Sequence, residues 1–69
     1  MIVKIAPLGE RVVEVNVEVG TSVGQAIDIS GVEINGRGIR LNNTDATLDT
    51  LINDEGAIIT LVNKMKGGR

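Results

Sequence analysis

The residues with the clearest chemical potential lie at the C-terminal end of the sequence. Two adjacent glycines, Gly67 and Gly68, follow a short polar spacer that contains Lys64 and Lys66. Glycine has no side chain to obstruct a narrow channel, and it adopts almost any backbone conformation. A thin, unbranched end of this kind can be threaded into the active site of another protein. The alternative interpretation is an ordinary flexible end with no chemical role.

The remaining residue types exclude most catalytic chemistry. The 69-residue chain contains no cysteine and no histidine, so it lacks disulfides, thiolate metal ligands and the usual acid–base group at neutral pH. Ser22 and Ser30 are its only serines, and no histidine or cysteine is present to activate them. The acidic residues are spread along the chain, without a metal-ligand cluster or an obvious pair for acid–base catalysis. We therefore predict that the protein is not an enzyme and binds no metal or cofactor.

Length and composition indicate one small globular domain. A chain of this length buries a modest core, and its 42% hydrophobic content is mostly valine, isoleucine and leucine, with no aromatic residue. The formal charge of −2 argues against non-specific nucleic-acid binding, which needs a basic surface. No segment reads as a signal peptide or a transmembrane helix. We expect a cytoplasmic protein that binds neither nucleic acid nor membrane and is monomeric when free.

Hydrophobic periodicity predicts a hairpin, a helix, two short strands, a turn and a final strand. Strict alternation in the second strand places Val13, Val15, Val17 and Val19 on one apolar face. The last strand is apolar at nearly every position, as expected for a strand that is central in its sheet or covered on both faces. The predicted strands are residues 2–6, 13–19, 32–34, 39–41 and 57–62, and residues 42–45 are predicted to be a loop.

The predicted helix covers residues 22–29. Ser22 and Gln25 have the spacing of a capping box, and an apolar set at helical spacing faces the sheet. This set consists of Val23, Ala26, Ile27 and Ile29. A further helical turn is expected over residues 47–52, with Leu48, Leu51 and Ile52 directed to the core.

Every predicted element finds a partner if the first and last strands lie side by side in parallel at the centre of the sheet. That arrangement is the β-grasp, an α+β fold in which a mixed four- to five-stranded sheet packs on one short helix. We expect residues 1–62 to form this domain and residues 63–69 to form a flexible C-terminal tail that carries the Gly-Gly pair.

Three stretches resemble the ubiquitin-like β-grasp family, most closely its small sulfur carriers of thiamine and molybdopterin synthesis and the prokaryotic ubiquitin-like modifiers. Residues 22–27 (Ser-Val-Gly-Gln-Ala-Ile) are similar to the family's Thr-Val-x-x-Leu-Leu helix start. Residues 32–36 (Val-Glu-Ile-Asn-Gly) are similar to its Val-x-Val-Asn-Gly turn. Residues 55–62 are similar to its Asp-Gly-Asp-x-Val-x-Leu-Val strand, and Gly67-Gly68 follows at a similar spacing. The resemblance spans almost the whole chain.

The resemblance implies a carrier or protein modifier whose terminal glycine carboxylate is activated by an adenylating enzyme that uses ATP. The activated carboxylate would become a thiocarboxylate or pass on as a thioester. Two positions depart from the family pattern: Ala57 replaces an acidic residue, and Arg69 follows the glycines. A processing protease would have to remove Arg69 before activation.

A second class of function is a plain interaction module on the same fold. Ile2 and Val12 are expected on the outward faces of their strands, beside Lys4 and Glu14, where they would form a partner patch or remain scattered exposed residues. Lys64 and Lys66 would guide the tail to an acidic cleft or merely keep it soluble. A small basic site at Arg37 and Arg40 is the last alternative, against a simple solvated face.

Overall fold

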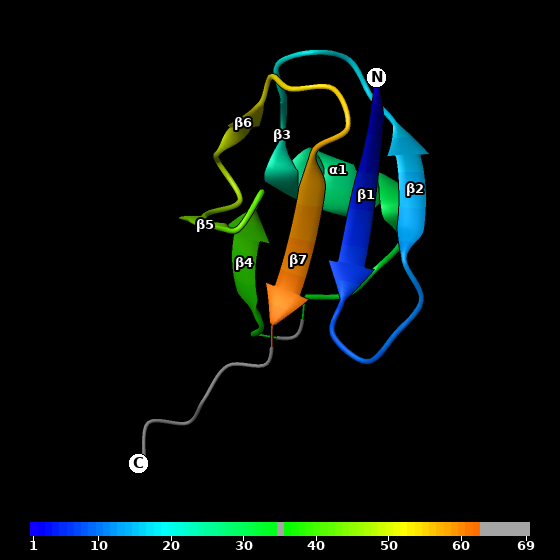
Figure 1. Ribbon diagram of the computed structural model, residues 1–69, viewed down its shortest axis with the longest axis vertical. Coiled ribbons are helices and arrows are strands. Elements are labelled where there is room, and N and C mark those ends of the chain that lie inside the picture. The colour runs from blue at the N-terminus through cyan, green and yellow to red at the C-terminus, as the bar shows by residue number, and fades with distance from the viewer. Residues whose placement is uncertain (35, 63–69) are drawn as a thin grey trace.

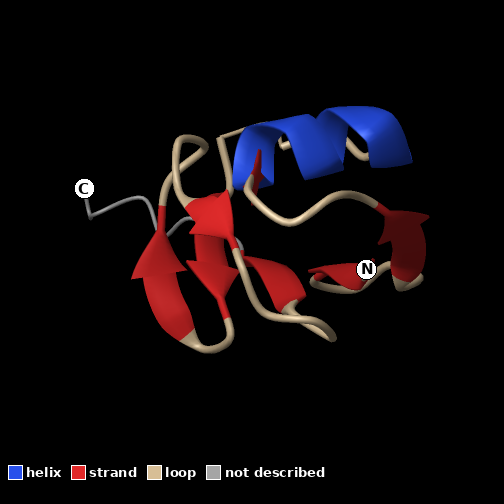
Figure 2. Ribbon diagram, turned by 90° about the horizontal axis from the view of Figure 1, so that it is seen from above, coloured by secondary structure: helices blue, strands red, loops and turns tan. Residues whose placement is uncertain are grey.

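The computed structural model describes residues 1–34 and 36–62 and contains, within them, a mixed five-stranded sheet crossed on one face by a helix (Figure 1). Seen from above, the helix and the sheet form two layers (Figure 2). The strand order is β2-β1-β7-β4-β5, and β3 and β6 form a separate pair. The elements are β1 (Ile2–Pro7), β2 (Val13–Asn16), β3 (Thr21–Ser22), α1 (Val23–Ser30), β4 (Gly38–Leu41), β5 (Thr44–Ala46), β6 (Leu51–Ile52) and β7 (Ile58–Val62).

The first and last strands are adjacent and parallel at the centre of the sheet, which confirms the predicted pairing. Lys4 is paired with Ile58 and Pro7 with Leu61. β1 also forms an antiparallel hairpin with β2, and β4 pairs antiparallel with the other edge of β7. The domain is therefore an α+β arrangement in which β7 is hydrogen-bonded on both sides.

The core lies between the sheet and α1. Strand alternation directs Val3 and Ile5 of β1, and Ile59 and Leu61 of β7, to the helix side, where each is fully buried. The core also contains Val15, Val17, Val23, Ala26, Ile27, Ile52 and Ala57. No polar or charged residue is buried as a whole among the described residues, so burial of aliphatic surface is the main source of stability.

Each end of the helix lies within one residue of the predicted bounds. The Gln25 amide donates to the Ser22 hydroxyl, and the Ser22 amide donates to the Gln25 side chain, which completes a capping box. Gly31 ends the helix in the left-handed conformation, where glycine avoids the Cβ clash of other residues. The prediction that Ile29 faces the core is wrong. Ile29 lies roughly 200° around the helix from Ile27, and it is exposed.

The predicted apolar face of the second strand is one residue too long, because Val19 is 69% exposed. β1 begins at Ile2. The last residues paired across the hairpin are Met1 and Val17, and the Val17 amide donates to the Met1 carbonyl. Beyond that point no neighbouring strand covers the chain. The backbone instead turns through Gly20, at a φ of 91°.

Residues 32–34 do not form the predicted third strand. Both edges of β4, the strand that follows, are already paired with β7 and β5, so the five-stranded sheet offers no place beside β4. The segment instead connects α1 to β4: the Val32 amide donates to the Ser30 hydroxyl, and the Ile34 carbonyl accepts from the Arg37 amide. Asn35 lies outside the described residues.

The predicted helical turn over residues 47–52 is also wrong. Residues 47–50 form a turn closed by a hydrogen bond from the Thr50 amide to the Thr47 carbonyl, and β6 then pairs with β3. Successive residues of a strand point to opposite faces, so Ile52 is buried while Leu51 is exposed. Leu48 is exposed as well.

The expected loop at residues 42–45 is a tight hairpin instead. Asn42 and Asn43 form its turn with φ angles of 52° and 70°, as a primed two-residue turn requires. β5 begins immediately after it, at Thr44. Asn42 also exchanges two bonds with Ile58, because its amide donates to the Ile58 carbonyl and its side-chain oxygen accepts from the Ile58 amide.

Candidate interaction surface

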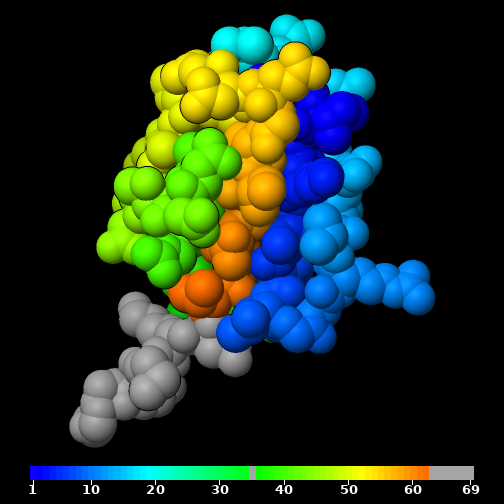
Figure 3. Space-filling view, viewed as in Figure 1, coloured from blue at the N-terminus to red at the C-terminus, as the bar shows by residue number. Residues whose placement is uncertain are grey.

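The outer face of the sheet, opposite α1, carries an apolar strip at its centre. We define the outer strip as Ile2 and Ala6 of β1 with Ile58 and Val62 of β7. Ile2 and Ile58 are 41% and 43% exposed, whereas Ala6 and Val62 are half-buried. Ile58 is paired in register with Lys4. Ile2 and Ala6 are therefore the diagonal neighbours of Ile58 on β1, within reach of the Ile58 side chain. Figure 3 shows this face, with β1 in dark blue beside β7 in orange.

Polar and charged side chains lie both within the outer strip and beside it: Lys4 stands between Ile2 and Ala6 on β1, and Thr60 stands between Ile58 and Val62 on β7. Lys4 lies opposite Glu14 on β2, and Arg40 of β4 approaches Asp45 of β5, with 3.7 Å between Nε and Oδ1. Exposed pairs of this kind stabilise a fold by less than about 1 kcal/mol. The outer strip is therefore an apolar surface that Lys4 and Thr60 interrupt, and protein interfaces likewise combine apolar and polar side chains.

The two described residues of the predicted partner patch are separated along the hairpin. Ile2 is paired with Asn16, whereas Val12 precedes Val13, the partner of Ile5. Both are exposed, but three to four register positions lie between them, or roughly 10–13 Å. Ile2 belongs to the outer strip, and Val12 lies near its other end.

Sequence reasoning missed Ile58 and Val62, the β7 members of the outer strip. The nearly continuous apolar run of the last strand suggested cover on both faces. In the structure only one face of β7 is covered by α1, and burial alternates along the strand. The signal that could have identified both residues is the period of two itself, applied from the buried Ile59.

The other predicted site residues, Lys64, Lys66, Gly67, Gly68 and Arg69, lie outside the described residues. β7 is the last described element, and its final residue, Val62, is paired with Gly38 at the end of the sheet. The sequence that carries the diglycine therefore follows directly from the central strand.

Arg37 and Arg40 do not form a common basic site. The Arg37 Nη2 atom lies 2.6 Å from the Glu10 carboxylate, which belongs to the loop between β1 and β2. Its Nη1 atom is buried without a hydrogen-bond partner. Arg40 instead lies on the outer sheet face beside Asp45. Each arginine therefore has its own acidic neighbour.

Within residues 1–34 and 36–62, no helix is long and apolar enough to cross a membrane. The same residues contain no group of three or more His, Cys, Asp or Glu side chains that could hold a metal ion. Comparison with known proteins gave no family model and no curated relative that matches the chain.

Proposed function

We propose that this protein is a ubiquitin-like β-grasp carrier or modifier whose C-terminal glycine is activated by an adenylating enzyme. The observation that carries the proposal is the parallel pairing of β1 with β7 at the centre of a mixed sheet packed on one helix. β7 ends at Val62, and the diglycine follows five residues later in the sequence. The fold order and the position of the glycines together support the β-grasp assignment.

The proposed chemistry takes place on the partner enzyme. The Gly68 carboxylate attacks the α-phosphate of ATP, an acyl-adenylate forms and pyrophosphate leaves. A sulfur nucleophile then displaces AMP, giving a thioester or a thiocarboxylate. This chain supplies the carboxylate and the docking surface and no catalytic residue. Arg69, with anything else that follows Gly68, must first be removed by a protease.

The outer strip is the surface that we assign to the adenylating enzyme. It contains apolar side chains that are partly open to solvent on the two central strands, and β7 leads directly into the segment that must reach the enzyme. Lysine in place of Ile58 would remove an apolar side chain and add a charge that must be desolvated on docking. We expect Ile58→Lys to weaken docking at least tenfold while the fold is retained.

The test uses the form that ends at Gly68, incubated with the adenylating enzymes of its host and ATP. Mass spectrometry should detect an adenylate, a thioester or a thiocarboxylate on this form and none on the chain that retains Arg69. The Gly68→Val variant of the same form is the matched control, since it keeps the carboxylate but adds a side chain. If the Gly68 form is inert towards every adenylating enzyme of the host, the carrier proposal is wrong.

The second candidate is an interaction module that acts through the outer strip without activation of its terminus. The exposure of Ile2 and Ile58 favours it, because this surface exists independently of the glycines. A partner that binds the chain equally well after Gly67 and Gly68 are both replaced by serine, but not after Ile58→Lys, would identify this function.

A further inference from the structure

The outer edge of β2 carries backbone groups that no strand pairs among the described residues. β2 is the outermost strand on its side of the sheet and is bonded to β1 alone (Figures 1 and 3). Met1 and Val17 exchange two hydrogen bonds, because the Val17 amide donates to the Met1 carbonyl and the Met1 amine donates to the Val17 carbonyl. Doubly bonded pairs alternate with unbonded pairs along antiparallel strands. The backbone groups of Glu14 and Asn16 therefore face the open edge.

The side chains of β2 alternate between the two faces of the sheet. Val15 is buried on the helix side, where Val13 also packs against the core, whereas Glu14 and Asn16 are exposed on the outer side. The Asn16 Oδ1 atom accepts from the Met1 amine at 3.2 Å, which leaves the Asn16 side-chain NH₂ group to donate elsewhere. The Glu14 carboxylate can only accept. The open edge therefore offers a side-chain donor and a side-chain acceptor two residues apart.

An antiparallel copy of β2 can pair with this edge about a two-fold axis at any of the four residues of the strand. Such an axis places each side chain opposite one on the same face of the second copy. An axis at Glu14 places the two Glu14 carboxylates directly opposite each other, and an axis at Asn16 places Glu14 opposite Glu18. Like charges directly opposite each other are destabilising. An axis at Val13 places Asn16 opposite Glu10, which lies outside β2. The remaining axis passes through Val15.

We propose that two copies of the chain associate through β2 about an axis at Val15. Glu14 of each copy is then opposite Asn16 of the other, and both residues have their backbone groups at the open edge, so these two pairs form four backbone hydrogen bonds. The Asn16 NH₂ group donates to the opposite Glu14 carboxylate, and on the helix side valine faces valine. The two Glu14 side chains are diagonal neighbours, and Lys4, opposite each of them on β1, reduces their repulsion.

The two five-stranded sheets become one continuous sheet of ten strands in this dimer. The two-fold axis keeps both helices on one face and both outer strips on the other. The interface uses neither the outer strip nor the glycines, so it is independent of the proposed carrier function. The monomer expected from the sequence is the alternative state, and the experiments below separate the two.

The first test is sedimentation equilibrium of the full chain over a concentration series that reaches about 1 mM. We expect a monomer–dimer equilibrium with a dissociation constant below about 1 mM, and a monomer throughout would overturn the proposal. Glu14→Pro removes an amide that faces the open edge, where proline is tolerated. This variant should keep the far-ultraviolet circular dichroism spectrum and lose the dimer, whereas Glu14→Gln, which keeps the amide, should still associate. A dimer of the proline variant as strong as that of the parent chain would show that another surface is used.

Cysteine substitutions test the register, since the chain has no cysteine of its own. A mixture of the Glu14→Cys and Asn16→Cys chains, treated with oxidised glutathione, should form a disulfide between copies, because directly opposite Cα atoms lie about 5.5 Å apart. Each variant alone should cross-link at least fivefold less, because its two cysteines are diagonal neighbours roughly 7–8 Å apart. Efficient cross-linking of Glu14→Cys alone would refute the axis at Val15. Equal cross-linking in all three samples would indicate random collision and would overturn the interface.

Discussion

The two-way contact between Asn42 and Ile58 predicts a graded series of stabilities at position 42. Asn42 has a φ of 52°, its side-chain oxygen accepts from the Ile58 amide at 3.0 Å, and its own amide donates to the Ile58 carbonyl at 2.9 Å. Only the first bond depends on the side chain. Replacement by alanine removes that bond, a loss of about 1 kcal/mol, and places a Cβ in the left-handed region at a further cost of about 1 kcal/mol.

The variants at position 42 separate these two effects. We expect Asn42→Ala to lower the free energy of unfolding by about 2 kcal/mol through both effects together. Asn42→Gly should cost about 1 kcal/mol, because glycine tolerates the positive φ and loses only the bond. Asn42→Asp keeps an acceptor in the same place and should change stability by less than about 0.5 kcal/mol.

The assay is urea denaturation followed by far-ultraviolet circular dichroism, since the chain has no tyrosine or tryptophan to report by fluorescence. The urea midpoint should be highest for the parent chain and Asn42→Asp, lower for Asn42→Gly and lowest for Asn42→Ala. The dependence of the unfolding free energy on urea concentration should be the same for all four chains. Equal midpoints for the Ala and Gly variants would show that the positive φ carries no strain. An Asp variant as unstable as the Ala variant would show that the side-chain acceptor does not hold the Ile58 amide.

Three further changes test the packing and the helix start. Val17→Ala should cost about 1–3 kcal/mol through lost burial and a cavity, whereas Val19→Ala should cost less than about 0.5 kcal/mol, because Val17 is buried and Val19 is exposed. Equal midpoints in urea for these two variants would refute the conclusion that the buried face of this segment ends at Val17. Ser22→Ala removes the side-chain oxygen that caps α1 and should cost about 1 kcal/mol; a calorimetric melting temperature unchanged from that of the parent chain would show that the cap is dispensable.

The sequence predicted the elements whose signals are local and strong. Alternation identified β1 and the start of β2, and the Ser22–Gln25 spacing identified the start of α1 to within a residue. The parallel pairing of β1 and β7 is a non-local feature, and it was predictable only because each element needed a partner for its apolar face. The predicted end of the helix, residue 29, is one residue short of Ser30, which Gly31 follows as a left-handed cap.

The errors share a physical cause, which is competition for places in the sheet. The sequence of residues 32–34 favours a strand, but β4 is already paired on both edges. Leu51 and Ile52 have the apolar character of a helical face, yet β3 offers an edge, and pairing with it directs the two side chains apart. The local sequence pattern indicates which secondary structure a segment prefers. The neighbouring strands that are available for pairing decide which structure it forms.

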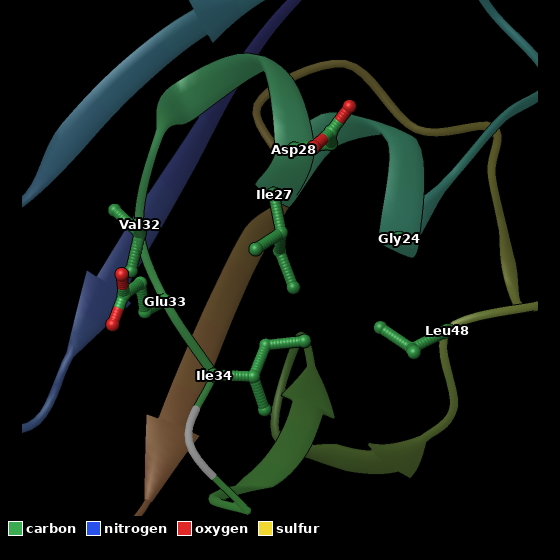
Figure 4. A pocket seen from close by; sticks show the side chains of 7 residues that line it. All are labelled: Gly24, Ile27, Asp28, Val32, Glu33, Ile34 and Leu48. Atoms are coloured by element: carbon green, nitrogen blue, oxygen red, sulfur yellow. The ribbon is translucent and has the colours of Figure 1, made fainter.

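The same competition shaped the surface of the domain. Because residues 32–34 are excluded from the sheet, Val32 and Ile34 are partly buried beside α1 and line a hollow with Leu48 (Figure 4). Because a single helix covers one face of the sheet, Ile58 and Ile2 remain exposed on the other. The exposed outer side chains lie outside the core, whereas Val32 and Ile34 pack against it. Substitutions at Ile2 and Ile58 should therefore alter binding while leaving the unfolding midpoint nearly unchanged, and that difference separates a functional role from a structural one.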